Sequence, residues 1–282
     1  MIERRTQFNW LLTLTTLGLL GTGVAHAQGC DGVRVGRVLG LAAAYTAAEG
    51  TAFAIKHDEW WDTPTRSFKV TWDASANSGQ DRLLHLTVGY HTAQLTTLAW
   101  RWACVPRTTA AWLGTALGIA VAIPKEIGDG VHEQKGFSGP DMLATAIGAT
   151  IPALHQTIPA TRIATLKFNY FPSDEYRNRT TGLPQIDNDY AGQRYYAAIV
   201  PGELPGGAGP WPDWLGVAVG HSVPHWISQP PINEWFVTLD LNAKGLPIKA
   251  PWWHKFAIVV DQFHIPLPGV RIKDGDLTFG LF

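Results

Sequence analysis

The sequence predicts an α+β protein in which an N-terminal bundle of about four small-residue-rich helices precedes a β-rich C-terminal part. Before Lys167, glycine and alanine recur at four-residue spacing within apolar stretches, which is typical of closely packed helices. After Lys167, short aromatic and β-branched runs alternate with Trp, Pro and Gly, which indicates strands joined by turns. We therefore expect three segments: 1–27 as a signal peptide, 28–166 as a membrane-associated bundle, and 167–282 as a β-rich module packed on it.

The N-terminus has the parts of a secretory signal. Arg4 and Arg5 precede an apolar run over residues 10–24, and Ala25-His26-Ala27 matches an A-x-A cleavage site, so the mature chain is expected to begin at Gln28. An uncleaved anchor helix is the alternative, although the run is shorter than the ~20 residues that a membrane span needs. We expect a membrane-associated protein of the periplasm or outer envelope of a Gram-negative bacterium.

The chain has two cysteines, Cys30 and Cys104. Export brings them into an oxidising compartment, which permits a disulfide between them. Cys30 also stands where a lipoprotein cysteine would, although Gln28 occupies a position that prefers a small or apolar residue. Lipidation and the disulfide compete for the same sulfur, and both interpretations stay open. The Cys/His spacing of a zinc site is missing from the sequence, so we expect no metal and no other cofactor.

The composition favours a membrane surface. The 282-residue chain is long enough for a full core, and its net charge of -1 gives it no electrostatic footprint for nucleic acid. Charged residues make up 16% of the chain, below the ~25% of typical soluble domains. The chain also carries 13 tryptophans, an aromatic excess typical of membrane interfaces. A membrane lipid or an envelope protein is the expected partner, and the oligomeric state stays undetermined.

Four helices are expected, over about residues 33–56, 79–102, 109–128 and 139–158. The second and fourth begin with the same S-x-x-D variant of the capping box. The expected caps are Ser78 with Asp81 and Ser138 with Asp141.

Small residues recur along all four helices and would let their backbones approach closely. This favours a membrane-embedded or membrane-apposed bundle, with a tight soluble bundle as the alternative. Arg34, Arg37 and Glu49 interrupt the first helix, and the third has only ~15 apolar positions against the ~20 of a full span. The stripes are Gly36, Gly40, Ala44 and Ala48; Gly89 and Ala93; Gly114, Gly118 and Ala122; and Ala144 and Gly148.

The C-terminal part is expected to form five strands. Each is a short run bounded by turn residues, and a Gly/Pro loop over 201–212 and a stiff connector over 229–231 separate some of them. The expected strands are 195–200, 214–219, 235–241, 256–260 and 277–282.

Several ordered motifs resemble the YfiM-like family of predicted periplasmic lipoproteins, a domain of unknown function. In the helical part they are Asp81-x-x-x-His85, Glu126-x-x-Asp129-Gly130, Gly136-Phe137-Ser138, Asp141, Ala144, Gly148 and Gln156. In the C-terminal part they are Asp189-Tyr190-x-Gly192-Gln193, Trp211-Pro212-x-Trp214-Leu215, Val219-Gly220 and Leu239-Asp240-Leu241. The helical part is also faintly similar to VanZ-like membrane proteins. The resemblance implies an envelope location and a helical core, and it implies no established reaction.

The chain departs from that family pattern at three positions. Lys135 stands where Trp is usual, Thr145 where Asn is usual, and His221 where Tyr is usual. The loss of the Asn removes a two-way hydrogen-bonding group from the fourth helix.

The candidate site combines His85, Glu126 and Asp129. Glu126 and Asp129 are three residues apart, so a continuing helix would place both on one face, where like charges raise one pKa as an acid/base pair requires. His85 lies one turn after Asp81, which would orient it as a general base or a metal ligand.

The alternative is a buried polar network whose members satisfy one another's hydrogen bonds and charges. Its expected members are Lys125, His85, Glu126 and Asp129. We favour the network, because no nucleophile in a recognised motif accompanies the acids. The expected function is a non-enzymatic envelope protein, membrane-associated and structural or interacting; a hydrolase or transferase acting on a lipid or cell-wall precursor is the alternative. Residues assigned to the network or to caps are Ser78, Asp81, Lys125, Ser138, Asp141 and Gln156.

Overall fold

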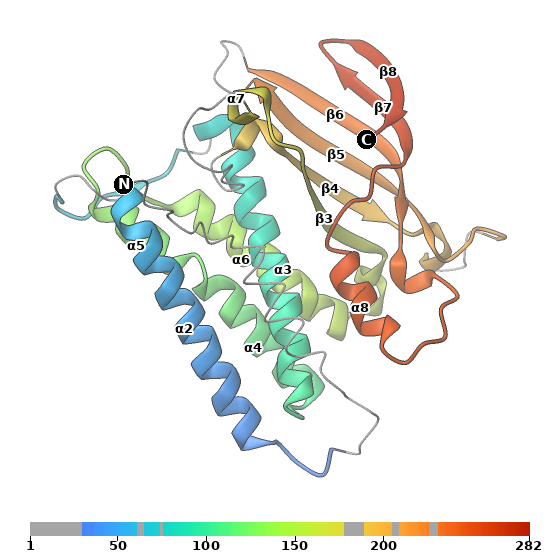
Figure 1. Ribbon diagram of the computed structural model, residues 1–282, viewed down its shortest axis with the longest axis horizontal. Coiled ribbons are helices and arrows are strands. Elements are labelled where there is room, and N and C mark those ends of the chain that lie inside the picture. The colour runs from blue at the N-terminus through green and yellow to red at the C-terminus, as the bar shows by residue number, and fades with distance from the viewer. Residues whose placement is uncertain (1–29, 61–64, 74–75, 178–188, 205–208, 226–230) are drawn as a thin grey trace, which may run out of the picture.

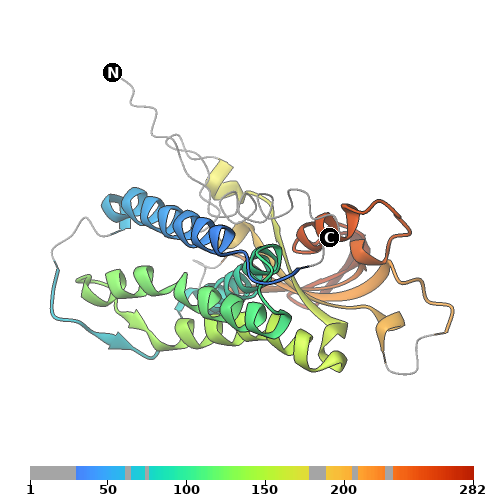
Figure 2. The same ribbon diagram turned by 90° about the horizontal axis from the view of Figure 1, so that it is seen from below.

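The computed structural model describes residues 30–60, 65–73, 76–177, 189–204, 209–225 and 231–282. The predicted signal peptide, residues 1–27, lies outside these ranges. The α+β class is confirmed: helices dominate up to Thr157, and a six-stranded sheet dominates from Ala164 onward. Figures 1 and 2 show the helices and the sheet side by side rather than intermingled. Lys167, where the composition changes, lies inside the first strand of that sheet.

The helical part contains five helices among the described residues. They are α2 (Val35–Trp60), α3 (Gln80–Trp102), α4 (Arg107–Ala120), α5 (Ile123–Val131) and α6 (Gly139–Thr157). The single helix expected over 109–128 is therefore divided into α4 and α5. Pro124 explains the break, because proline has no N–H and its ring clashes with the carbonyl four residues earlier. It stands in the first turn of α5, where the missing N–H costs nothing.

One helical stretch in the described part of the chain, Arg107–Val131, is long and apolar enough to cross a membrane, with a mean hydropathy of 1.3. It comprises α4 and α5, and 44% of its most apolar window is buried inside the protein. The core helix of a soluble protein meets the same criterion, so this stretch by itself is weak evidence for a span.

Helices α3, α4 and α6 pack tightly on one another. A Cβ placed on Gly89 would overlap the carbonyl of Thr145, and one on Gly148 would overlap the carbonyl of Leu86. The small residues of α3, α4 and α6 thus serve the close approach that their spacing predicted. Helix α2 differs, because a Cβ on Gly36 or Gly40 would meet nothing within 4 Å. The small-residue stripe at the start of α2 therefore faces away from the bundle.

The start of α2 is fastened to the end of α3. Cys30 and Cys104 form a disulfide. The N–H of Arg34 donates to the carbonyl of Ala103 at 2.9 Å, and the Arg37 guanidinium donates to the carbonyl of Trp102 at 2.8 Å while lying over the Trp102 ring. These contacts hold α2 at one end of the bundle.

The sheet is an antiparallel meander in the order β3-β4-β5-β6-β7-β8. Its strands are β3 (Ala164–Tyr170), β4 (Gln193–Ile199), β5 (Leu215–His225), β6 (Ile232–Leu241), β7 (Pro268–Lys273) and β8 (Asp276–Leu281). Two further short strands, β1 (Val70–Thr71) and β2 (Phe137–Ser138), pair in parallel beside the helices.

Four of the five expected strands correspond to β4, β5, β6 and β8. The strand expected over 256–260 is wrong, because this run belongs to helix α8 (Trp253–Val260). A short apolar run with aromatic and β-branched residues does not distinguish a strand from a buried helix. The remaining short elements are η1 (Ala76–Gly79), η2 (Pro159–Ile163), α7 (Asp174–Arg177), η3 (Tyr190–Gly192), η4 (Pro201–Glu203) and η5 (Ala243–Gly245).

The two faces of the sheet are covered by different parts of the protein. One face holds the buried cluster of Tyr196, Ala198, Ala218, Phe236 and Phe282. The segment after α8 lies along the free edge of β3, where Phe168 donates its N–H to Gln262 and accepts one from His264. On the other face, α3 contacts β3 and β4, and Phe168 and Tyr195 are buried there. The bundle therefore covers only the first strands of this second face.

Candidate functional site

A group of titratable side chains meets where α3, α5 and α6 converge. We call it the polar cluster: Asp81 and His85 from α3, Lys125, Glu126 and Asp129 from α5, and Asp141 from α6. All six except Lys125 are buried, with Glu126 only 1% exposed and His85 6% exposed. The structure thus brings together the three residues proposed for chemistry and three of those proposed for a network.

The Lys125 ammonium lies among the acids. Its Nζ is 3.0 Å from Oε1 of Glu126, 3.5 Å from Oδ2 of Asp129 and 3.3 Å from Nε2 of His85. Burial alone would lower the pKa of Lys125, but the carboxylates of Asp81, Glu126 and Asp129 outweigh burial and raise it above its usual value. Lys125 is therefore a permanent cation. Asp129 has a second neighbouring cation, because Nζ of Lys135 lies 3.1 Å from its Oδ1.

The hydrogen bonds of Thr145 define the protonation of His85. The Thr145 hydroxyl donates its only hydrogen to the carbonyl of Asp141 at 2.9 Å, so it can only accept from Nδ1 of His85, 2.9 Å away. Nδ1 then carries the imidazole hydrogen, and the lone pair of Nε2 faces Lys125. Burial and the Lys125 charge lower the pKa of His85 to about 4, against the opposing pull of Asp81. His85 is neutral at physiological pH.

Glu126 joins α5 to the start of α6. Its Oε2 accepts the N–H of Ser138 at 2.8 Å, while Oγ of Ser138 accepts the N–H of Asp141 at 3.3 Å as an N-cap. The cap expected from Ser138 is therefore present. Burial raises the pKa of Glu126, and the Lys125 ammonium opposes that shift.

The start of α3 differs from the expected capping box. Its N-cap is Gly79, with φ of 83°, and no side chain caps the helix. Ser78 precedes it in a left-handed conformation of its own, with φ of 52°. Asp81 instead turns into the cluster, where Oδ1 accepts from the Tyr190 hydroxyl at 3.1 Å.

Asp81 and Asp141 have opposite pKa shifts. Burial would raise the pKa of Asp81, but Lys125, His85 and the Tyr190 hydrogen bond together lower it. Burial and the Asp81 charge raise the pKa of Asp141 to about 6. Arg82 supplies a counter-charge to Asp141, with Nη1 3.6 Å from Oδ1.

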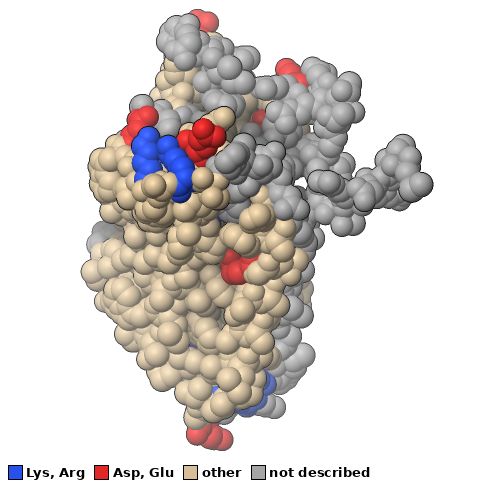
Figure 3. All heavy atoms as spheres, turned by 90° about the vertical axis from the view of Figure 1, so that its left-hand side faces the viewer, with Lys and Arg blue, Asp and Glu red and all other residues tan. Residues whose placement is uncertain are grey.

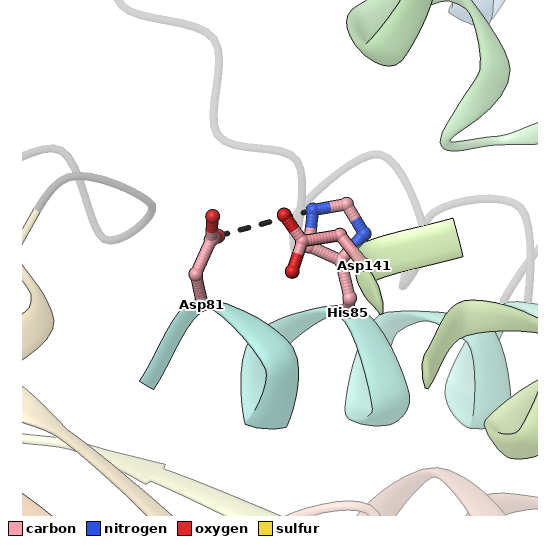
Figure 4. A group of neighbouring side chains, drawn as sticks. All are labelled: Asp81, His85 and Asp141. Atoms are coloured by element: carbon pink, nitrogen blue, oxygen red, sulfur yellow. Dashed lines mark ion pairs between the residues drawn. The ribbon is translucent and has the colours of Figure 1, made fainter. Parts of the chain in front are cut away.

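Figure 4 shows Asp81, His85 and Asp141 converging from two helices. Their ligand atoms lie within 4.8 Å of one another, which is the geometry of three donors to one metal ion. The donor set does not fit a divalent cation well, because the lone pair of His85 Nε2 faces the Lys125 ammonium. A metal would have to displace that ammonium, which already supplies the positive charge.

Gln156, also expected in the network, lies elsewhere. It is near the end of α6, and its side-chain oxygen accepts from the Arg107 guanidinium of α4. The C-terminal half contains a second buried group that sequence reasoning missed. Nζ of Lys167 lies 2.7 Å from Oδ2 of Asp240, whose Oδ1 is 2.8 Å from Nδ1 of His264. The Leu239-Asp240-Leu241 motif was the only signal that pointed to it.

Comparison with known proteins supports an envelope location. A family model described as a predicted periplasmic lipoprotein (DUF2279) matches residues 71–157. This segment runs from β1 to the end of α6 and contains the whole polar cluster, whereas the C-terminal motifs lie outside it. The match is consistent with an exported, periplasmic protein of unknown function. No curated protein and no solved structure matches the chain.

Proposed function

We propose that this chain is a non-enzymatic, membrane-associated protein of the cell envelope, in which the polar cluster is a structural network that fixes α3, α5 and α6 to one another. The observation that carries the proposal is the Lys125 ammonium, which contacts His85, Glu126 and Asp129 at 3.0 to 3.5 Å inside a buried site. Glu126 and Asp129, the acids in contact with Lys125, each already have a cation, so these contacts need no ligand.

Burial also argues against catalysis. A general base must reach a proton of its substrate, and Nε2 of His85 is enclosed by Lys125, Glu126 and Asp81 at 3.3 to 3.8 Å. With a pKa of about 4, the imidazole is also a weak base. The alternative, a hydrolase or transferase using His85, Glu126 and Asp129, gains support from the fixed tautomer of His85, which leaves an unprotonated nitrogen beside two acids.

Membrane association rests on separate observations. The helices expose large apolar side chains to their surroundings. Val35 and Leu39 of α2 are each 64% exposed, and Leu143 and Ile147 of α6 are 53% and 52% exposed. Figure 3 faces the left-hand side of Figure 1 and shows a broad, largely uncharged surface, with charges grouped in its upper part and at its bottom and one acidic patch between them. Such a surface suits a lipid environment better than water.

The two functions predict different outcomes for Asp129→Ala and His85→Ala. In a structural network, loss of one partner leaves buried charges unpaired and typically costs ~3–5 kcal/mol, so envelope level, melting temperature and protease resistance should fall together. Glu133→Ala is the matched control, because this acid lies in the same region but is exposed. Normal level and melting with lost complementation of a deletion strain would instead establish the catalytic alternative.

A further inference from the structure

The uncovered face of the sheet, over β5 to β8, is mainly apolar, apart from His221 and its hydrogen-bonded partner Asn233. Directly paired residues in an antiparallel sheet share a face, and the register places His221, Trp235, Ile272 and Leu277 in one row. The next row is Val219, Val237, Val270 and Phe279. We call these two rows, together with Leu281, the outer face. They contain no Asp, Glu, Lys or Arg.

The outer face is also strongly exposed. Phe279 is 80% exposed, Leu281 67% and Leu277 64%, while Val219 and Trp235 are each 50% exposed. Isolated apolar residues on a surface are ordinary, but a contiguous patch over four strands marks an interaction site.

The opposite face carries the charges of the sheet, beside the buried apolar cluster that contains Tyr196 and Phe236. Lys167 pairs with Asp240 at 2.7 Å, and Glu234 pairs with Lys273 at 3.3 Å and with Arg271 at 3.7 Å. Glu234 and Asp240 are 3% and 1% exposed. A half-exposed sheet in water shows the reverse arrangement, polar outward and apolar inward. Charges inward and apolar side chains outward are typical of sheets whose outer surface meets lipid.

We propose that the outer face of β5 to β8 is a lipid-contacting surface that seats this half of the protein in the interfacial region of a bilayer. This rests on the proposed membrane association and names the part of the sheet that takes part in it. The two rows run over four adjacent strands without a charged residue and include the half-exposed Trp235, and a broad apolar surface with such an aromatic is what the interfacial region of a bilayer covers.

Two features limit the depth of insertion. A six-residue strand such as β8 is about 20 Å long, shorter than the ~30 Å hydrocarbon core. The outer edge of β8 is also unpaired among the described residues, and open sheet edges do not occur deep in lipid. Both favour shallow seating, the depth at which exposed tryptophans such as Trp235 are typically found.

The test uses the mature chain with the Cys30–Cys104 disulfide intact and vesicles of phosphatidylethanolamine with a minority of phosphatidylglycerol. An environment-sensitive fluorophore is attached at Phe279→Cys or at Thr278→Cys, which is the matched control because it lies next in β8 on the opposite face and is also exposed. When vesicles are added, the fluorescence emission of the label at position 279 should shift to the blue, and spin labels on the lipid acyl chains should quench it. The label at position 278 should respond much less. Phe279→Ser with Leu281→Ser should weaken vesicle binding about tenfold or more.

The outcomes separate this inference from the proposed function. If the chain floats with vesicles while the label at position 279 stays as exposed to water as the label at position 278, membrane association stands and the outer face is not the contact. If the chain does not float at all, both proposals fail. A blue shift at 279 that depends on protein concentration without vesicles would show that a second copy covers the face and would overturn the lipid assignment.

Discussion

Lys125 and His85 lie with Nζ 3.3 Å from Nε2, an ammonium facing the lone pair of a neutral imidazole. The arrangement depends on Thr145, which turns the imidazole hydrogen away from the ammonium. It also depends on Glu126, which lies 3.0 Å from the ammonium on the other side. Lys125 thus occupies the position that a metal ion would take among such donors, and the consequences for stability can be measured.

Lys125→Met should destabilise the protein by about 3–5 kcal/mol, because it leaves buried carboxylates without their cation. Combining it with Glu126→Gln should cost less than the sum of the two single changes, because both remove the same interaction. Chemical denaturation of the four proteins of this cycle measures the coupling. Lys135→Met is the control; its side chain is 40% exposed, so it should cost about 1 kcal/mol or less. If the costs of the two single changes simply add, Lys125 and Glu126 do not stabilise each other, and the structural network is refuted.

His85 should make stability rise with pH between about 4 and 6.5. Its folded pKa of about 4 lies below the ordinary value of 6.5, so within this window the unfolded state binds more protons and acidification favours unfolding. His85→Gln should remove that dependence. The stability difference between wild type and His85→Gln should therefore grow from pH 4 to pH 6.5 by up to about 3 kcal/mol. A difference that stays constant over this range would show that His85 is not held neutral.

Asp141 should act in the opposite direction. Its folded pKa of about 6 lies above its ordinary value of 3.8, so the folded state binds more protons in that window and loses stability as pH rises through it. Asp141→Asn keeps the backbone N–H that Ser138 caps and removes the titration. Relative to wild type, the variant should gain up to about 3 kcal/mol between pH 4 and pH 7. Melting curves at both pH values test this, and a relative loss at pH 7 would contradict it.

The disulfide should be present in the mature chain and should carry much of the attachment of α2. Cys30 and Cys104 are 74 residues apart, and closing a loop of that length stabilises by about 4 kcal/mol in the chain-entropy model. Cys30→Ser should therefore lower the melting temperature and expose α2 to proteolysis. Intact-mass analysis under non-reducing conditions should show a chain starting at Gln28 with no free thiol. A diacylglyceryl mass on Cys30, with a free thiol on Cys104, would show lipidation instead.

The sequence by itself determined the local structure of the helices. Periodicity and small-residue spacing placed α3 and α6 within one or two residues, and the Ser138 cap was read from four consecutive positions. These features depend on neighbours along the chain. The break at Pro124 is equally local, because it depends on the proline itself, whereas the run of α8 is too short to show a period that would distinguish a helix from the expected strand.

Only the tertiary structure decided how the polar groups pair and which way the sheet faces. The sequence showed that Lys125, Glu126 and His85 lay close to other acids, but the tautomer of His85 depends on Thr145, 60 residues away, and Asp81 turns to Tyr190, 109 residues away. In the sheet, alternation shows two faces but not which one is covered. That is decided by the packing of α3 on β3 and β4 and by the segment after α8, contacts between distant residues that no local pattern encodes.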